Sequence, residues 1–283
     1  MWFTWRMAVI ELSAGTIDYE DTGGDGPAVL LLHGLLMDGS LWDAVVPELA
    51  GFRCVVPTLP LGAHRRPLPG ADLSLPAVAR LVTDLVERLD LRDVTLVGND
   101  TGGAVAQLIA ADPARAERFS RLMLVSCEAF DNLPPGLTGR TLAVTGKLPP
   151  AAFKAFMQQM RLKPMRRLPL AFGWLTKRGD ATTARWIRPV LDVPGIAVDT
   201  VRVLRAAFAD RDLLVRAAAG LPGFDRPAAV VWAAGDRVMP PDHGRRLADL
   251  LPQGHLVEVP DSYTLIPLDQ PALLAKVVRE LAA

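Results

Sequence analysis

The chain has 283 residues, of which 50% are hydrophobic and 22% charged, and its formal net charge is zero. This length and balance suit one α/β domain with an insertion and exclude a disordered chain. The longest apolar runs are far shorter than the ~20 residues of a membrane-spanning helix, and the opening MWFTWRMAV lacks the apolar stretch of a secretory signal. Two cysteines without metal-ligand spacing, Cys54 and Cys127, predict a cytoplasmic protein in a reducing environment, with no metal site.

The first 130 residues alternate short β-rich runs with helical periodicity. Val9–Leu12 and Thr16–Tyr19 are expected to form a hairpin. Buried parallel strands are expected at Ala28–His33 and Cys54–Thr58, with a helix over Leu41–Ala50 between them. Further along, the pattern predicts a helix at Leu75–Leu89, a strand at Val94–Val97, a helix at Gly102–Ala111 and a strand at Leu122–Ser126. This alternation indicates a doubly wound, mostly parallel α/β sheet.

The alternation stops between residues 131 and 222, where only helical periodicity and proline breaks remain. Helices are expected there at Pro149–Met160, Pro164–Leu175, Ala181–Val190, Ile196–Asp210 and Asp212–Ala219. The alternation then resumes with a strand at Ala229–Ala233, a helix at Pro241–Leu251, a strand at Leu256–Val259 and a helix at Pro271–Leu281. The sequence therefore predicts a core of residues 1–130 and 223–283. A helical cap (lid) of residues 131–222 is inserted in it and covers the substrate end of the sheet.

The cap is strongly basic. Between Arg140 and Arg188 it holds eleven lysines and arginines against one acid, Asp180. One interpretation is a solvated helical surface, and the other is a lid that faces an anionic substrate, carrier or partner. No nucleic-acid motif or interleaved aromatic residues accompany this charge, so the pattern predicts no nucleic-acid partner.

A tight strand-to-helix turn is predicted at Gly98-Asn99-Asp100-Thr101-Gly102-Gly103. Small residues two positions before and after Asp100 permit the backbone to turn sharply and to present the Asp100 side chain. The segment His33-Gly34-Leu35 follows an earlier strand and supplies a second backbone N–H. Leu35 and Thr101 are therefore expected to form an oxyanion hole beside Asp100.

At these motifs the chain resembles the α/β-hydrolase superfamily, over nearly its whole length. An aspartate at the turn resembles the haloalkane dehalogenase and epoxide hydrolase branch. The resemblance implies that Asp100 attacks carbon to form an ester, and that a histidine held by an acid activates water to hydrolyse it. Asp236, in the loop Ala234–Pro241, matches the family's acid. Glu128 is a second candidate acid, at a position some dehalogenases use, and the alternative is an ordinary exposed loop residue.

The family's histidine is missing. Its loop is matched without a gap by Asp261-Ser262-Tyr263-Thr264-Leu265-Ile266-Pro267, in which Thr264 stands at the histidine position. Of the four histidines, His64, in the loop after the Cys54–Thr58 strand, is the one candidate replacement base, with a contact to the lid as its alternative role. His243 is expected at the surface, and His255 at the far end of the last strand.

Substrate contacts are assigned to side chains near the turn and in the cap, namely His33, Asn99, Tyr263, Trp174 and Trp186. Bracing of its own loop is the more usual role of a histidine placed like His33, and apolar packing is the more usual role of the two tryptophans. Two residue types that the family uses in its active sites are absent from this sequence at the expected positions. Epoxide hydrolases use lid tyrosines, and this chain has only Tyr19 and Tyr263; dehalogenases place a tryptophan where Thr101 stands.

Three functions remain open. The first is a hydrolase that acts through Asp100 with His64 or a carboxylate as the substitute base. Its substrate is expected to be a small apolar organic molecule, and the basic lid suggests that part of this molecule is anionic. The second is a non-hydrolytic isomerase, cyclase or lyase in which Asp100, Asp236 and Glu128 converge, so that one carboxyl pKa rises and a proton is transferred. The third is a ligand-binding pseudoenzyme. No cofactor is expected, because the glycine-rich Gly23-Gly24-Asp25-Gly26 joins two strands and is a turn.

Overall fold

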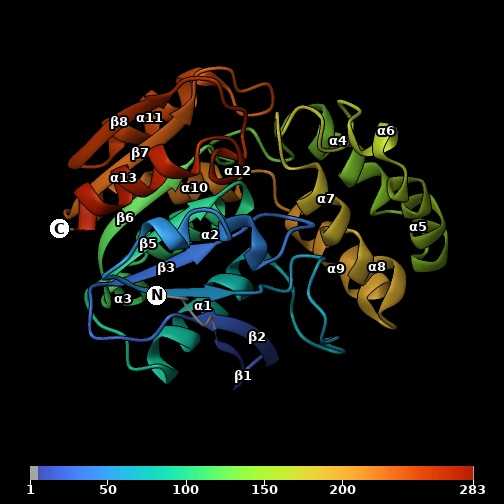
Figure 1. Ribbon diagram of the computed structural model, residues 1–283, viewed down its shortest axis with the longest axis horizontal. Coiled ribbons are helices and arrows are strands. Elements are labelled where there is room, and N and C mark those ends of the chain that lie inside the picture. Colours follow the sequence, from blue (N-terminus) through green and yellow to red (C-terminus); the bar gives the residue numbers. More distant parts are fainter. Residues whose placement is uncertain (1–5, 283) are drawn as a thin grey trace.

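The computed structural model describes residues 6–282, so most of the opening segment MWFTWRMAV lies outside the described residues. Eight strands form one sheet in the order β1-β2-β4-β3-β5-β6-β7-β8 (Figure 1). They are β1 (Arg6–Leu12), β2 (Gly15–Asp21), β3 (Ala28–Leu32), β4 (Arg53–Pro57), β5 (Val94–Asn99), β6 (Phe119–Val125), β7 (Pro227–Ala233) and β8 (Gln253–Val259). β2 pairs antiparallel with β1 and β4, and the other pairs are parallel. The predicted, mostly parallel α/β sheet is confirmed.

Helices of the core cover the sheet, and their boundaries follow local signals. They are α1 (Leu75–Arg88), α2 (Thr101–Ala110), α3 (Pro113–Ala116), α10 (Leu213–Gly220), α11 (Pro241–Leu250), α12 (Ile266–Asp269) and α13 (Pro271–Ala282). Ser74 caps α1 by accepting the Ala77 backbone N–H, and a proline stands in the first turn. Every residue of β5 is buried, as expected for a central strand covered on both faces. The rigid centre of the sheet thus carries the Asp100 turn.

The helix expected over Leu41–Ala50 does not form, and this expectation was wrong. The segment instead makes two short 3₁₀ turns, Gly39–Trp42 and Val46–Glu48. Pro47 lies inside the expected helix, where it lacks an N–H and its ring clashes with the carbonyl four residues earlier. The buried side chains of Leu41 and Trp42 anchor the segment to the core without a regular helix.

The cap helices gather beside one end of the sheet (Figure 1). They are α4 (Gly136–Thr145), α5 (Pro150–Met157), α6 (Lys163–Arg166), α7 (Asp180–Trp186), α8 (Arg188–Asp192) and α9 (Ile196–Ala207), with a 3₁₀ turn at Gln158–Arg161. The helix expected at Pro164–Leu175 is shortened to α6, since Pro169 interrupts the periodicity. The helix expected at Ala181–Val190 is split into α7 and α8, and α4 was not expected. α10 packs against α2, so the last of the expected cap helices lies on the core.

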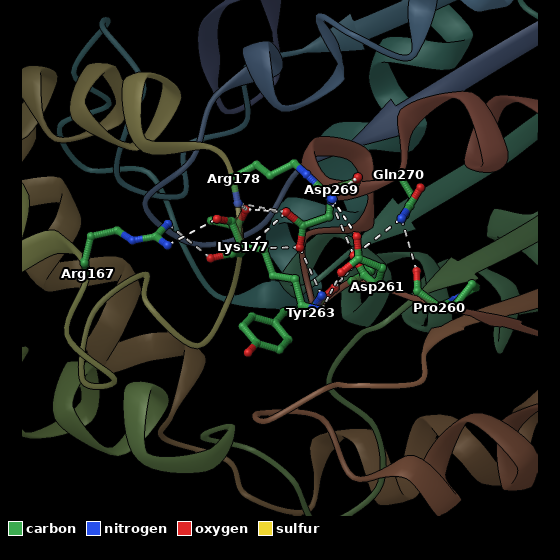
Figure 2. Close-up of polar contacts among 10 residues, drawn as sticks. Arg167, Lys177, Arg178, Pro260, Asp261, Tyr263, Asp269 and Gln270 are labelled. Carbon is green, nitrogen blue, oxygen red and sulfur yellow. Dashed lines mark hydrogen bonds and ion pairs between the residues drawn. The ribbon is translucent and has the colours of Figure 1, made fainter.

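Polar contacts clamp the cap to the loop that holds Thr264 (Figure 2). The buried Asp269 carboxylate accepts the backbone N–H groups of Lys177, Arg178 and Tyr263 and the Thr176 hydroxyl. Lys177 and Arg178 also pair with Asp261. Further ion pairs of cap residues are Arg161–Asp192, Lys163–Asp180, Arg166–Asp180 and Arg185–Asp43. Many of the cap's lysines and arginines therefore form ion pairs with carboxylates of the protein itself.

None of the helices within residues 6–282 is both long and apolar enough to cross a lipid bilayer.

Candidate active site

Asp100 lies in a strained turn between β5 and α2, with φ 55° and ψ −133°. An alanine Cβ built at residue 98 would lie 2.3 Å from the Gly102 carbonyl oxygen. One built at residue 102 would lie 2.4 Å from the Leu32 carbonyl oxygen. Glycine at these two positions therefore allows the turn to close and α2 to begin directly against β3.

The Asp100 carboxylate is held by the backbone groups that the sequence assigned to an oxyanion hole. Its Oδ1 accepts the Thr101 backbone N–H at 2.8 Å and lies 3.1 Å from the Thr101 hydroxyl oxygen. The Leu35 backbone N–H also donates to this carboxylate. A Cβ at Gly34 would lie 2.1 Å from Oδ1, so the close approach of the His33-Gly34-Leu35 loop requires glycine.

Glu128 is connected to Asp100 through the hydroxyl group of Thr101, which contacts both carboxyl groups. The Thr101 Oγ1 lies 2.7 Å from Glu128 Oε1 as well as 3.1 Å from Asp100 Oδ1. Glu128 is fully buried, so the interpretation of this residue as an exposed loop acid was wrong. A hydroxyl has one proton to donate, so both contacts are hydrogen bonds only when one of the two carboxyl groups is itself protonated.

Asp236 binds Thr264, the residue that the sequence comparison places at the histidine position. Asp236 Oδ1 accepts the Thr264 hydroxyl at 2.8 Å and the backbone N–H groups of Val238 and Met239 at 2.9 Å each. Asn99 Nδ2 donates to the Thr264 carbonyl at 2.8 Å. Asn99 thus holds the Thr264 loop at the end of β5, and the Thr264 hydroxyl is a hydrogen-bond partner of Asp236.

Burial raises the pKa of all three carboxyl groups. For Asp100, desolvation outweighs the hydrogen bonds from Thr101 and Leu35 and raises the pKa to about 6, with a further contribution from the Asp236 charge. For Glu128, desolvation and then the Asp100 charge raise the pKa well above its usual value. Desolvation also raises the pKa of Asp236. The Thr101 hydroxyl shared by the two carboxyl groups and the strongly raised pKa of Glu128 together favour a protonated Glu128 beside an ionised Asp100.

Stability is expected to depend on the Asp100 charge. Its folded-state pKa of about 6 lies above the ordinary 3.8, so folding favours the protonated form of Asp100. The stability that this form contributes is fully present below pH 3.8 and is lost as the pH rises through 6. The unfolding free energy of Asp100→Asn, taken relative to that of the wild type, is therefore expected to rise by about 2–3 kcal/mol from pH 4 to pH 7. Urea unfolding at both values measures this. A difference that does not change with pH would contradict the shift.

A cavity of about 490 Å³ opens above Asp100 and Glu128. The two acids are buried and form its floor, and apolar side chains of the cap, among them Met157, Met160 and Phe172, line its walls. Leu137, Val144, Leu168 and Leu170 also line it but are 39–66% exposed, so they mark its mouth. The sequence did not identify the cap residues, because their helical spacing is the same as that of ordinary core residues.

The two histidines predicted to lie near the site, His33 and His64, are held by other partners. His64 Nδ1 accepts the Gly62 N–H, and Nε2 lies 3.4 Å from the Asp199 carboxylate of α9, so it contacts the lid. His33 Nε2 accepts the Leu59 N–H at 2.8 Å, Nδ1 lies 2.9 Å from the Gly34 carbonyl oxygen, and burial lowers its pKa to about 4. Among residues 6–282, the cavity lining includes neither ring.

The other predicted contacts lie around the cavity rather than in it. Trp186 is fully buried and donates to Asp38 and the Ser40 hydroxyl, while Trp174 is half-buried; the described lining includes neither. Tyr263 stacks with Lys177 and Arg237 outside that lining. His243 was expected at the surface but is buried edge-on against Phe130, so that expectation was wrong. His255 lies in β8 as expected.

Comparisons with known proteins agree with this architecture. Haloalkane dehalogenase 2 of Mycobacterium tuberculosis is 28% identical over 95% of this chain and 92% of its own. An uncharacterized protein of the same species is 39% identical over 104 residues, and a haloalkane dehalogenase of Mesorhizobium japonicum is 35% identical over 107. These two shorter alignments span only 30% and 34% of those relatives.

Solved structures share the fold. The haloalkane dehalogenase DbeA of Bradyrhizobium elkani superposes with a TM-score of 0.77 at 18% identity, covering 98% of this chain and 99% of that one. A thermophilic esterase of Thermogutta terrifontis gives a TM-score of 0.68 at 24% identity, covering 97% of each chain. The family described as "alpha/beta hydrolase fold" matches residues 27–271, which is most of the sequence. This protein is therefore a member of the alpha/beta hydrolase fold family.

Proposed function

We propose that the protein is a hydrolase in which Asp100 attacks an electrophilic carbon of a small apolar substrate and forms an ester intermediate. The supporting observation is the position of the Asp100 carboxylate beside the cavity: its Oδ1 accepts the Thr101 backbone N–H, and the Leu35 backbone N–H donates to the same carboxylate. If the other carboxylate oxygen forms the ester bond, Oδ1 becomes the ester carbonyl oxygen. It then already accepts the Thr101 N–H, which with the neighbouring Leu35 N–H would stabilise the oxyanion that forms when water attacks.

The cavity favours an apolar substrate, and its charges are unevenly placed. Asp100 and Glu128 at the floor disfavour an anionic group there. Arg140 is the one cationic side chain in the described lining, and it lies at the exposed mouth. An anionic part of the substrate would therefore lie at the mouth beside Arg140, with the apolar part directed toward Asp100. The two free, buried cysteines are consistent with a cytoplasmic location, which remains a prediction.

Replacing Arg140 with glutamine is expected to weaken binding of decanoate about 2–5-fold and to leave decanol binding unchanged, because an exposed charge contact contributes less than about 1 kcal/mol. Isothermal titration calorimetry at low salt measures both ligands. Lys147→Gln removes an exposed cap charge outside the described lining and is the matched control. Equal weakening of both ligands, or an equal effect in the control, would argue against a carboxylate at the mouth.

A single turnover in ¹⁸O-labelled water tests the nucleophile. If Asp100 attacks carbon, the first product takes its oxygen from the unlabelled carboxylate, and the peptide that contains Asp100 gains ¹⁸O. Direct attack of water would place ¹⁸O in the first product and leave the peptide unlabelled. Haloalkanes, epoxides and activated esters form the substrate panel, and peptide mass spectrometry is the readout. Binding without any turnover would favour the pseudoenzyme.

Proton transfer without hydrolysis is the second candidate. It is favoured by the Thr101 hydroxyl, which lies within hydrogen-bond distance of both Asp100 and Glu128 and so connects a base with an acid. Such an enzyme would exchange a carbon-bound hydrogen of its substrate with deuterium from heavy water. It would also incorporate no ¹⁸O into either the product or Asp100. These isotope patterns distinguish it from the hydrolase.

A further inference from the structure

Glu128 is a buried acid that the attack of Asp100 does not itself require. It lines the cavity floor, and its Oε1 contacts the Thr101 hydroxyl at 2.7 Å. Its Oε2 is buried and has no hydrogen-bond partner in residues 6–282. An unpaired, buried polar oxygen costs free energy, so its retention beside a nucleophile points to a group that acts on bound substrate.

The described cavity lining holds few groups that can move a proton. It contains no histidine, tyrosine, lysine or tryptophan, so Glu128 is its only acid besides Asp100. A halide leaves carbon as a stable anion and needs no proton. An alkoxide released by ring opening is strongly basic and does need one. The lining therefore fits an electrophile whose leaving atom is oxygen.

We propose that Glu128 acts in turn as acid and base at this site, and that the substrate is an apolar epoxide. This inference rests on the proposed role of Asp100 as the nucleophile. In the first step a bond forms between Asp100 and the epoxide carbon, and the carbon–oxygen bond of the ring breaks. The proton of Glu128 passes to the released alkoxide. The products of this step are a hydroxyalkyl ester of Asp100 and an ionised Glu128.

In the second step Glu128 is the base. It takes one proton from a water molecule as the water oxygen bonds to the Asp100 carboxyl carbon, and the N–H groups of Leu35 and Thr101 hold the oxyanion. When the ester bond breaks, the second hydrogen of the water passes to the departing diol. Asp100 is again a carboxylate and Glu128 is again protonated, so charge and protons balance over the cycle.

Electrostatics drives the change of role. The Asp100 charge helps to hold the proton on Glu128 in the free protein. Esterification removes that charge, so Glu128 releases its proton to the alkoxide more readily and then remains ionised, which is the form that can accept a proton from water. The other titratable groups nearby are Asp236, whose charge acts on Asp100, and the buried Cys127 thiol, whose pKa is raised well above its usual value. Thr101 is a positioning residue that connects the two carboxyl groups.

Glu128→Gln keeps the shape of the side chain but can neither give nor take this proton. We expect it to slow formation of the Asp100 ester from styrene oxide by about 10²–10⁴-fold. With 1-bromohexane, whose leaving group needs no proton, any ester that forms should persist in the variant, because its hydrolysis lacks a base. Intact-protein mass spectrometry in rapid-quench time courses follows both probes. Glu117→Gln, an exposed acid, is the matched control.

Two further readouts are available, and the first of them does not depend on the stability of the Glu128→Gln variant. Thr101→Val removes the bridging hydroxyl but keeps the backbone N–H, and we expect it to shift the pH profile of ester formation. The infrared difference spectrum between wild type and Glu128→Gln at pH 7 should contain one protonated carboxyl band.

Two outcomes would overturn the inference, and they differ. Wild-type rates and pH profile in Glu128→Gln, with ¹⁸O still entering Asp100, would exclude this role of Glu128 alone. No ¹⁸O in wild-type Asp100 with either probe would exclude the nucleophile, and with it the role of Glu128.

Discussion

Replacing Asp100 with asparagine is expected to lower turnover by at least about 10⁴-fold and to abolish ¹⁸O uptake at position 100. An amide is a poor nucleophile toward carbon, whereas the Asp100 carboxylate, with a pKa of about 6, is mostly ionised at pH 7.5. The amide oxygen can still accept the Thr101 N–H, so the turn is expected to persist. Steady-state rates and peptide mass spectrometry after a single turnover measure the two effects.

Asp131→Asn is the control for this variant, because the Asp131 side chain is 87% exposed. It should retain wild-type turnover and wild-type ¹⁸O uptake. The fold of Asp100→Asn is checked by its cooperative unfolding, which we expect to be preserved. If Asp100→Asn kept more than about a tenth of the wild-type rate, Asp100 would not form the covalent intermediate.

Gly98→Ala is expected to destabilise the protein by about 3 kcal/mol or more. The added methyl group would lie 2.3 Å from the Gly102 carbonyl oxygen and 2.7 Å from the Gly103 nitrogen. Both are backbone atoms at the start of α2, which packs against β5 and β6 and cannot shift without moving the turn. A loss of this size lowers the melting temperature of a domain this large by about 5–10 °C. Differential scanning calorimetry measures it.

Gly223→Ala provides the comparison, since a methyl group there would contact nothing within 4 Å. We expect its melting temperature to stay close to that of the wild type. If Gly98→Ala had the same melting temperature as the wild type, the turn would be able to relax around the added methyl group at little cost in free energy. In that case its glycines would not be required for packing.

If Thr264 replaces the family's histidine, as the sequence predicts, another group has to act as the base. Thr264 donates to Asp236 through its hydroxyl, but a hydroxyl of ordinary pKa cannot activate water at neutral pH. His64 is held between Gly62 and Asp199 and is absent from the described cavity lining. Glu128 lies at the cavity floor and retains an unpaired oxygen. These positions support the proposal that a carboxyl group, rather than a relocated imidazole, takes the role of the base.

Local sequence signals determined the sheet and the Asp100 turn. Apolar strand runs, the Ser74 cap and the glycines around Asp100 each act within a few residues, so their consequences could be predicted without knowing what lies across the molecule. Predictions failed where prolines competed with helical periodicity. The region of Pro47 formed 3₁₀ turns, and the region of Pro169 formed only a short helix.

Only the tertiary structure decided the state of the carboxyl groups and the partners of the histidines. Glu128 and Thr101 are 27 residues apart and His64 and Asp199 are 135 apart, so no local pattern links the members of either pair. Glu128 is fully buried against Thr101 and Gln107 of α2, and this burial raises its pKa. The sequence supplied the reactive groups, and packing between distant segments decided which of them share a proton.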